Sequence, residues 1–264
     1  MTDKEQPWFR LPDHALVALE GRDALAFSQA QFMSDVTSLA DGQWHWSGWL
    51  TPKGRVIALF ALLRRDAERI WLVLHDADPE GFVDALRRYV FRSKVAISAR
   101  GELPIAGTFA PPTTGVFLDL GGDGGARTLR IGGDAAASDL DAVERWTTFD
   151  LSHGLPRLPP SQAEQWTPQQ LSLERLRAFS VKKGCYPGQE IVARTHFLGQ
   201  AKRGLALLGG DGTLSPGAEV RTGDRVLGTV VSSSGSVALA VLPVARDSDI
   251  PGVRELPLLG GLAR

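Results

Sequence analysis

The sequence predicts an α+β fold in which strands outnumber helices, and three observations lead to this class. Residues 56–63 form an unbroken apolar run, which is typical of a strand buried on both faces. The segment Asp78-Pro79-Glu80 opens a helix, and apolar residues then recur at spacings of three and four. From residue 203 onward, short β-type runs are separated by Gly, Ser and Asp, as in a small antiparallel barrel or sandwich.

Composition and charge are those of an ordinary globular protein. Of 264 residues, 43% are hydrophobic and 22% are charged, and 29 basic against 30 acidic residues give a net charge of −1. This balance provides no global basic field that would attract nucleic acid. The apolar run at 56–63 is too short to cross a membrane, and residues 1–7 lack the apolar core of a secretory signal. We therefore expect a cytoplasmic protein that binds neither membranes nor, directly, nucleic acid.

The first hundred residues predict one compact α+β unit. Residues 15–19 are typical of a strand and residues 23–32 are compatible with a helix. Trp44, Trp46 and Trp49 follow at nearly alternate spacing, which predicts a strand with one aromatic face. A single indole of this kind more often fills a core than lines a pocket, but the set also offers a wall for a flat ring. Further strands at 56–63, 70–74 and 95–99, with the helix that starts near residue 79, complete a lobe of ferredoxin-like type.

The middle of the chain gives weaker signals. Residues 101–141 are rich in Gly, Pro, Thr and Asp, and they contain two possible short strands at 116–120 and 127–131. Residues 142–151 show no clear period. Thr167 followed by Pro168 could cap and start a helix that leads towards residue 182.

The only cysteine of the chain lies in the segment Lys182-Lys183-Gly184-Cys185-Tyr186-Pro187-Gly188-Gln189-Glu190. Nearby cations favour the thiolate, so we expect Lys183 to lower the pKa of the Cys185 thiol. Pro187 and Gly188 suit a tight turn, because proline fixes φ and glycine accepts a positive φ. A lone cysteine is more often a small buried hydrophobe, but these neighbours favour a functional thiol.

Residues 189–197, which follow this turn, fit two conformations. As a strand, Glu190 and Arg194 would share one face with Val192 and His196. As a helix, Glu190 and Arg194 would form an i,i+4 ion pair with the acid on the N-terminal side. The helix is favoured, and its first N–H groups would then face Cys185 and any anionic ligand.

No metal site or catalytic triad can be assigned from side-chain spacing. One cysteine excludes an intrachain disulfide and a cysteine-only metal cage. The histidines show no HxxxH or HExxH spacing, and they are His14, His45, His75, His153 and His196.

The cysteine segment carries a resemblance to a known family. The pattern Lys-Gly-Cys-Tyr-x-Gly-Gln-Glu followed by Ala-Arg resembles the signature of YgfZ-type proteins, which are folate-binding relatives of the aminomethyltransferase (T-protein) of the glycine cleavage system. The match has a single wildcard, at Pro187, and extends to Ala193 and Arg194. Two earlier blocks also resemble the family: Gly21-x-Asp23-Ala24-x-x-Phe27, although Ser28 and Met33 depart from its usual residues, and Pro52-x-Gly54-Arg55.

This resemblance implies a T-protein-like multi-lobe fold with ferredoxin-like lobes and a small C-terminal antiparallel β-barrel. Residues 1–200 would form the folate-binding α+β core, and residues 201–264 the barrel. Within the core, a second lobe would cover about residues 50–140, and the cysteine motif at 182–194 would return to the first lobe.

The resemblance also implies a site and its partners. Cys185 would be the functional thiol, assisted by Lys183, and tetrahydrofolate would be the cofactor. Family members help to make or maintain iron–sulfur clusters and influence tRNA modification, so client or assembly proteins for such clusters are the expected partners. The candidate folate-binding residues are Tyr186, Gly188, Gln189, Glu190, Arg194 and Trp46.

One departure from T-protein bears on the chemistry. T-protein carries an acidic pair, including the aspartate its reaction needs, where this chain has Ala58 and Leu59. Because an apolar pair cannot accept or orient a proton, aminomethyl transfer is not expected. An alternative is a folate-dependent aminomethyl or one-carbon transferase that uses Asp35, Glu174 or Glu190 as proton acceptor. A third hypothesis, direct action on tRNA, is disfavoured by the near-neutral charge.

Overall fold

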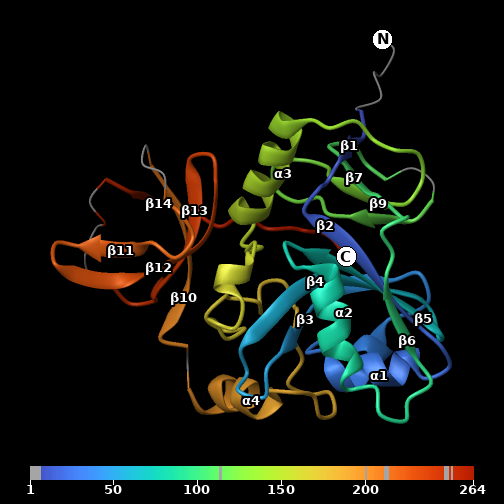
Figure 1. Cartoon of the computed structure of the whole chain (residues 1–264). Coiled ribbons are helices and arrows are strands. Elements are labelled where there is room, and N and C mark those ends of the chain that lie inside the picture. The colour runs from blue at the N-terminus through green and yellow to red at the C-terminus, as the bar shows by residue number, and fades with distance from the viewer. Residues whose placement is uncertain (1–6, 113–114, 200, 211–213, 247–249, 251) are drawn as a thin grey trace.

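The computed structural model describes residues 7–112, 115–199, 201–210, 214–246, 250 and 252–264. Within these residues the chain forms three antiparallel sheets and four α-helices (Figure 1). None of these helices has the length and apolar character needed to span a lipid bilayer.

The central sheet has five strands in the order β3-β4-β5-β2-β6. Its long strand β4 (Val56–Asp66) buries side chains on both faces, as the apolar run predicted. Leu59, Ala61 and Leu63 point into one core, whereas Ala58, Phe60 and Leu62 point into the other. The remaining strands are β2 (His14–Glu20), β3 (Trp44–Leu50), β5 (Arg69–His75) and β6 (Ala96–Ala99).

Two helices cover one face of the central sheet (Figure 1). Helix α1 (Ala24–Gln31) contributes Phe27 to this core, and α2 (Pro79–Arg87) contributes Phe82, Val83 and Leu86. The side chain of Asp78 caps α2 by accepting hydrogen bonds from the N–H groups of Glu80 and Gly81, at 3.2 and 3.1 Å. The helix start near residue 79 is therefore confirmed.

A second sheet, in the order β1-β7-β9-β8, lies beyond the other face. Helix α3 (Leu140–Ser152) packs Trp146 against it, and the ring of Trp146 comes so close to Gly107 that a Cβ there would lie 2.8 Å from it. The strands are β1 (Phe9–Arg10), β7 (Ile105–Thr108), β8 (Phe117–Asp119) and β9 (Thr128–Ile131).

The third sheet is a curled sheet in the order β11-β12-β13-β10-β14, and it has its own small core. Helix α3 lies between it and the second sheet, and the hydroxyls of Thr148 and Ser234 are 3.0 Å apart there (Figure 1). Its strands come only from the C-terminal segment: β10 (Arg203–Gly209), β11 (Glu219–Thr222), β12 (Arg225–Ser234), β13 (Val237–Pro243) and β14 (Arg254–Leu256).

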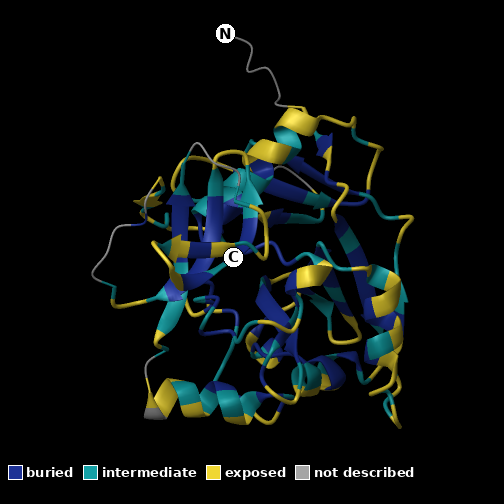
Figure 2. Cartoon of the chain, turned by 60° about the vertical axis from the view of Figure 1, so that its left-hand side comes forward, coloured by how far each residue is buried: buried dark blue, intermediate teal, exposed yellow. Residues whose placement is uncertain are grey.

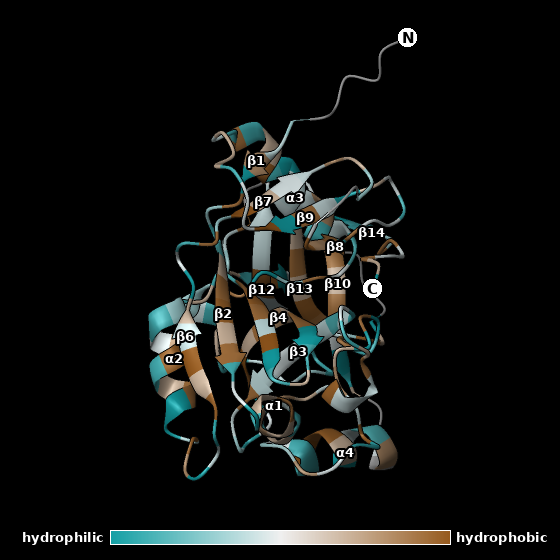
Figure 3. Cartoon of the chain, turned by 90° about the vertical axis from the view of Figure 1, so that its right-hand side faces the viewer, coloured by the Kyte–Doolittle hydropathy of each residue, from teal (hydrophilic) through white to brown (hydrophobic). Residues whose placement is uncertain are grey.

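Helix α4 (Gln189–Leu198) and two short 3-10 turns, η1 (Val36–Ser38) and η2 (Pro160–Gln162), complete the chain. Figure 2 shows mostly intermediate and exposed residues along α4, at the edge of the molecule. In Figure 3, α4 mixes hydrophilic and hydrophobic residues, whereas strands such as β2 and β10 are largely hydrophobic. This difference fits a surface helix that contributes few residues to the core, among them Val192.

Three local expectations were wrong. Residues 142–151 lie within α3, although their sequence shows no clear period. Residues 167–177 form successive turns instead of a helix, with Ser172 and Arg177 at φ +50° and +52°. The tryptophans of β3 do not share one face, because Trp44 and Trp46 pack in one core and Trp49 in the other.

Two domain boundaries stay predictions. The expected lobe boundary near residue 50 falls in the turn between β3 and β4, which are hydrogen-bonded neighbours in the central sheet. The expected boundary near residue 200 precedes β10, the first strand of the third sheet.

Candidate functional site

The candidate site centres on the cysteine loop, which we define as residues 180–188. Cys185 is exposed in this loop, directly before α4. The predicted Pro187-Gly188 turn is confirmed, because Gly188 has φ +78° and forms the N-cap of α4. Helix α4 confirms the favoured conformation of residues 189–197. The thiol is therefore presented to solvent by a loop of defined shape.

Lys183 anchors the loop to the end of α1. Its Nζ donates hydrogen bonds to the carbonyls of Gln29, Phe32 and Ser34, at 2.6, 2.6 and 2.8 Å. Burial lowers the pKa of Lys183 to about 8, since desolvation disfavours the ammonium form, while the charge of Asp35 opposes this shift. All three ammonium donors are thus directed at backbone carbonyls. This geometry gives Lys183 a positioning role, which its sequence context did not indicate.

Tyr186 and Gln189 brace the same loop from inside. The hydroxyl of Tyr186 donates to the carbonyl of Ser180 at 3.1 Å, and burial raises the pKa of Tyr186. The ammonium of Lys183 lies 5.0 Å from the centre of the Tyr186 ring, within the range of a cation–π contact. The side-chain amide of Gln189 donates to the carbonyl of Lys183 at 3.0 Å. These two predicted folate-binding residues therefore hold the loop together.

Gly188 joins the cysteine loop to the turn between β3 and β4. A Cβ on Gly188 would lie 2.7 Å from the Cα of Gly54 and 2.7 Å from the carbonyl oxygen of Thr51. A Cβ on Gly54 would in turn lie 2.9 Å from Ile191. The block Pro52-x-Gly54-Arg55 and the cysteine motif are more than 100 residues apart in sequence. Their backbones nevertheless touch, at positions where only glycine fits.

The two charged candidates on α4 lie apart from these contacts. Glu190 and Arg194 are both exposed, and no ion pair joins them in the part of the chain that the structure describes, so the expected i,i+4 pair does not form. The helix is tied down instead through the side-chain amide of Gln169, which donates to the carbonyl of Val192 at 2.8 Å.

Trp46 is a core residue and not a pocket wall, which corrects the assignment of this indole to a ligand site. Only 1% of it is exposed, and its Nε1 donates to the carbonyl of Leu262 at 3.4 Å. Its ring packs edge-on against Trp44 and His75. The neighbouring Trp49, which points to the opposite face of β3, does line a cavity.

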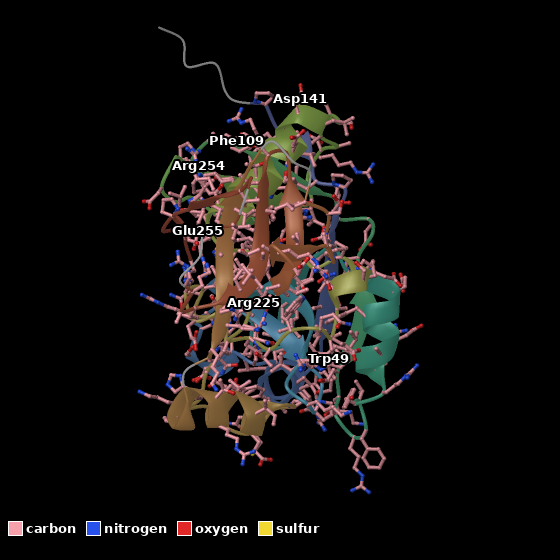
Figure 4. All side chains as sticks on the ribbon, turned by 90° about the vertical axis from the view of Figure 1, so that its left-hand side faces the viewer. Trp49, Phe109, Asp141, Arg225, Arg254 and Glu255 are labelled. Carbon is pink, nitrogen blue, oxygen red and sulfur yellow. The ribbon has the colours of Figure 1, made fainter. Side chains whose placement is uncertain are left out.

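This cavity, which we call the Ala58 cavity, has a volume of about 220 Å³. It lies on the α2 side of the central sheet, where Ala58 pairs with Trp49 in the β3–β4 register. Figure 4 shows Trp49 close to α2, and its ring is edge-on to Phe82 at 5.4 Å. Ala58, the position where the sequence resemblance led us to expect an acid in T-protein, thus faces a small, mostly apolar cavity.

Asp76, which follows β5, brings a carboxylate to the wall of the Ala58 cavity. Its backbone has φ +60°, which is uncommon for a residue with a side chain. The guanidinium of Arg157 donates to both oxygens of Asp76 at 2.6 Å. Burial raises the pKa of Asp76, and the charge of Arg157 opposes this shift. Asp76 was not among the residues predicted from the sequence; its position directly after a buried strand was the available signal.

The salt bridge of Asp76 continues into the interior as the buried charge chain Asp76–Arg157–Asp150–Arg127. Arg157 approaches Asp150 at 3.4 Å, and Arg127 pairs with the other oxygen of Asp150 at 2.6 Å. Arg127 and Asp150 are both fully buried. Arg127 also lies 4.1 Å from the centre of the Trp146 ring. The cavity carboxylate is therefore the outer end of a rigid ionic network.

The three acids proposed for the alternative transferase are not brought together. Asp35 accepts hydrogen bonds from Thr37 and Gln29, which lower its pKa despite partial burial. Burial raises the pKa of Glu174, and Glu190 is exposed on α4. None of the three lines the Ala58 cavity.

Comparison with known proteins finds similar sequences and, separately, a similar fold. A search against protein-family models finds no match. A protein of Aliivibrio fischeri named tRNA-modifying protein YgfZ is 28% identical over 90% of this chain and 86% of its own length. The YgfZ of Klebsiella pneumoniae is also 28% identical, over 84% of this chain and 79% of its own length. This chain is a homologue of YgfZ. The resemblance found in the cysteine motif therefore extends over most of the sequence.

Among solved structures, the aminomethyltransferase T of the glycine cleavage system from Bartonella henselae has a similar fold. Its TM-score is 0.69 with 18% sequence identity, over 90% of this chain and 78% of that protein. At this identity the match shows the fold alone. The predicted α+β, T-protein-like fold is confirmed for this YgfZ homologue, and its C-terminal sheet curls into a half-barrel.

Proposed function

We propose that this chain is a folate-binding accessory protein that supports iron–sulfur cluster assembly or repair through Cys185. Its effect on tRNA modification would be indirect, through a cluster-dependent modifying enzyme. The relatives are named tRNA-modifying protein, which supports a link to tRNA modification. The net charge of −1 favours an indirect link over binding of tRNA by this chain.

The exposed thiol of Cys185 is the observation that carries this proposal. Lys183, Tyr186 and Gly188 fix the loop on both sides of the thiol, so it is presented to a partner at little further entropic cost. A thiolate is the usual protein ligand of iron–sulfur clusters, which need several such ligands. Because the chain has one cysteine, a cluster would be shared with a client or assembly protein.

The Ala58 cavity is our candidate for the pterin ring of tetrahydrofolate. Its walls include the aromatic rings of Trp49 and Phe82, which suit a flat heterocycle. The carboxylate of Asp76 can accept hydrogen bonds from the adjacent N–H groups of an aminopyrimidine edge. Ala58 itself offers no proton acceptor. These residues fit folate binding better than they fit aminomethyl transfer.

One observation favours the alternative, a folate-dependent one-carbon transferase. Asp76 lines the same cavity, and burial raises its pKa towards the range of a general acid or base. The second carboxylate of the cavity, that of Asp78, already caps α2. Formation of methylenetetrahydrofolate from an aminomethyl donor by the pure protein, and its loss in Asp76→Asn, would support this alternative.

The test of the main proposal is calorimetric titration with tetrahydrofolate under reducing conditions. We expect binding by the unmodified protein and at least about tenfold weaker binding by Ala85→Phe, which narrows the Ala58 cavity from α2. Ala193→Phe on α4 is the matched control, because Ala193 is similarly half-buried and lies outside that cavity. No binding at millimolar tetrahydrofolate, or equal binding by Ala85→Phe, would contradict the proposal.

A further inference from the structure

A second cavity, larger than the Ala58 cavity, lies next to the cysteine loop, and we call it the Arg177 cavity. Its volume is about 540 Å³, within the range of small-molecule sites in proteins. Ser34 and Ser180 line it; the carbonyl of Ser34 accepts a hydrogen bond from Lys183, and Ser180 is the first residue of the cysteine loop. Its walls come from the residues after α1, the start of β3, the turns before Cys185 and Arg264.

The charges on the cavity wall favour an anion. Among the lining side chains, Arg177 and Arg264 contribute two positive charges and Asp35 one negative charge, so the charged side chains sum to +1. His45 remains neutral at pH 7, because burial lowers its pKa to about 4. The guanidinium of Arg177 has no hydrogen bond or ion pair within the described ranges, whereas that of Arg264 donates to the carbonyls of Leu262 and Arg175. Arg177 therefore has all of its donors free for a ligand.

The position of Arg177 is held by an unusual backbone conformation. Its φ of +52° lies in the left-handed region, which residues with a Cβ rarely adopt. Such conformations persist where the surrounding structure enforces them, and here the turns at residues 171–178 do so. The exposed guanidinium is thus aimed at the cavity by a constrained turn and not by a freely varying surface loop.

The remaining wall residues suit a nucleoside. Phe179 and Trp44 provide apolar surface for a flat ring. The carboxylate of Asp35 stays ionised, because hydrogen bonds from Thr37 and Gln29 lower its pKa, and a fixed carboxylate is a good acceptor for ribose hydroxyls. Ser180 adds a hydroxyl group that can donate to a phosphate oxygen, whereas the hydroxyl of Ser38 already donates to the backbone carbonyl of Asp35.

We propose that the Arg177 cavity binds a nucleoside 5′-monophosphate, with Arg177 and Arg264 on the phosphate, Asp35 on the ribose and Phe179 and Trp44 against the base. A guanidinium group can donate two parallel hydrogen bonds to a phosphate, which a lysine ammonium cannot, so Arg177 and Arg264 suit a phosphate better than lysines would. The site is independent of the Ala58 cavity: no residue lines both cavities.

The test is calorimetric titration with adenosine 5′-monophosphate, adenosine and inorganic phosphate. We expect the monophosphate to bind at least about tenfold more tightly than either fragment. Arg177→Asn should weaken this binding about tenfold or more, because it removes charge-assisted hydrogen bonds to the phosphate. Asparagine tolerates a positive φ, so the turn should persist. Trp44→Phe should remove part of the fluorescence change on binding.

Arg88→Asn is the matched control, because Arg88 is equally exposed, lacks an ion pair within the described ranges and lies outside the cavity. Equal binding by Arg177→Asn and Arg88→Asn would overturn the proposal. So would absence of binding at millimolar monophosphate, or binding of phosphate alone as tightly as the monophosphate. A single-stranded RNA with a 5′-phosphate that binds where the free monophosphate does not would also overturn it, in favour of a strand-end site.

Discussion

The cysteine loop and the buried charge chain both hold buried cations, but they stabilise these positive charges in different ways. Lys183 is surrounded by backbone carbonyls, which are dipoles without net charge. Arg127 and Arg157 are paired with the full charges of Asp150 and Asp76. The hydrogen bonds from Lys183 to the carbonyls hold one short segment in place. Loss of one partner from a buried ion pair, in contrast, leaves an unpaired charge in the protein interior. We therefore expect the loop to respond locally to mutation and the charge chain to respond globally.

The largest effect should come from Asp150→Asn. This change removes the ionic partner shared by Arg127 and Arg157 in the interior, and breaking a buried pair of this kind costs about 3–5 kcal/mol. Urea unfolding followed by circular dichroism would measure the loss in free energy of unfolding. Asp84→Asn is the control, because the Asp84–Arg87 pair is exposed and contributes little. Equal losses of unfolding free energy in the two variants would mean that the buried charge chain stabilises the fold no more than an exposed ion pair does.

Lys183→Met should give the next largest effect. It leaves three carbonyls without their donor, at a cost of about 1–3 kcal/mol, with the loss concentrated in the loop and the end of α1. Hydrogen exchange at residues 29–34 would detect this local opening. The exposed neighbour Lys182 provides the control, and Lys182→Met should change stability by no more than about 0.5 kcal/mol. Protection that is unchanged in Lys183→Met would refute the anchoring role.

The charge chain also predicts acid sensitivity, through two buried histidines. His14 and His75 face each other across β2 and β5, and burial lowers the pKa of both well below 6.5. The positive charge of Arg157 lowers both pKa values further. Below pH 6.5 the unfolded chain binds protons that the folded chain does not, so stability is complete above pH 6.5 and is lost as the pH falls.

For each histidine, the slope of the unfolding free energy against pH should approach about 1.4 kcal/mol per pH unit. Unfolding free energies measured between pH 7 and 5 would check it. His75→Gln should flatten the curve, whereas His196→Gln, on exposed α4, should leave its shape unchanged. A pH curve that His75→Gln does not alter would show that another group is responsible.

The smallest effect on stability should come from Cys185→Ser, within about 0.5 kcal/mol, because the side chain is exposed. The same change should abolish support for cluster-dependent enzymes in cells that depend on this protein. Measured activities of such enzymes, beside those in cells carrying Lys182→Met, would check this expectation. Full activity with Cys185→Ser would remove the thiol from the proposed mechanism.

Local signals in the sequence predicted the elements that local physics determines. The apolar run gave β4, the cap at Asp78 gave α2, and the Pro187-Gly188 turn gave the start of α4. Helix α3 was missed because its buried side includes the charged Asp150 while the apolar Leu140 is exposed, so hydrophobicity does not follow burial along it. The site was predicted at Cys185, but the roles of its neighbours depend on contacts with residues far away in sequence.

Lys183 illustrates this limit. Because Lys183 lies two residues before Cys185, the sequence indicated that its charge would activate the thiol. Its actual partners are carbonyls about 150 positions away in sequence, which no local pattern reveals. Asp76 and Arg177 were missed for a related reason. Each is an unremarkable charged residue in sequence, and only the left-handed backbone and the cavity beside it single it out.

The contact between Gly54 and Gly188 has a consequence for evolution. Where two side chains touch, a change in one can be compensated by a change in the other. Here backbone meets backbone, so the clash caused by a larger residue at either position cannot be relieved by shortening a side chain at the other. Across an alignment of relatives, the two positions should therefore be invariant together, instead of showing correlated exchange.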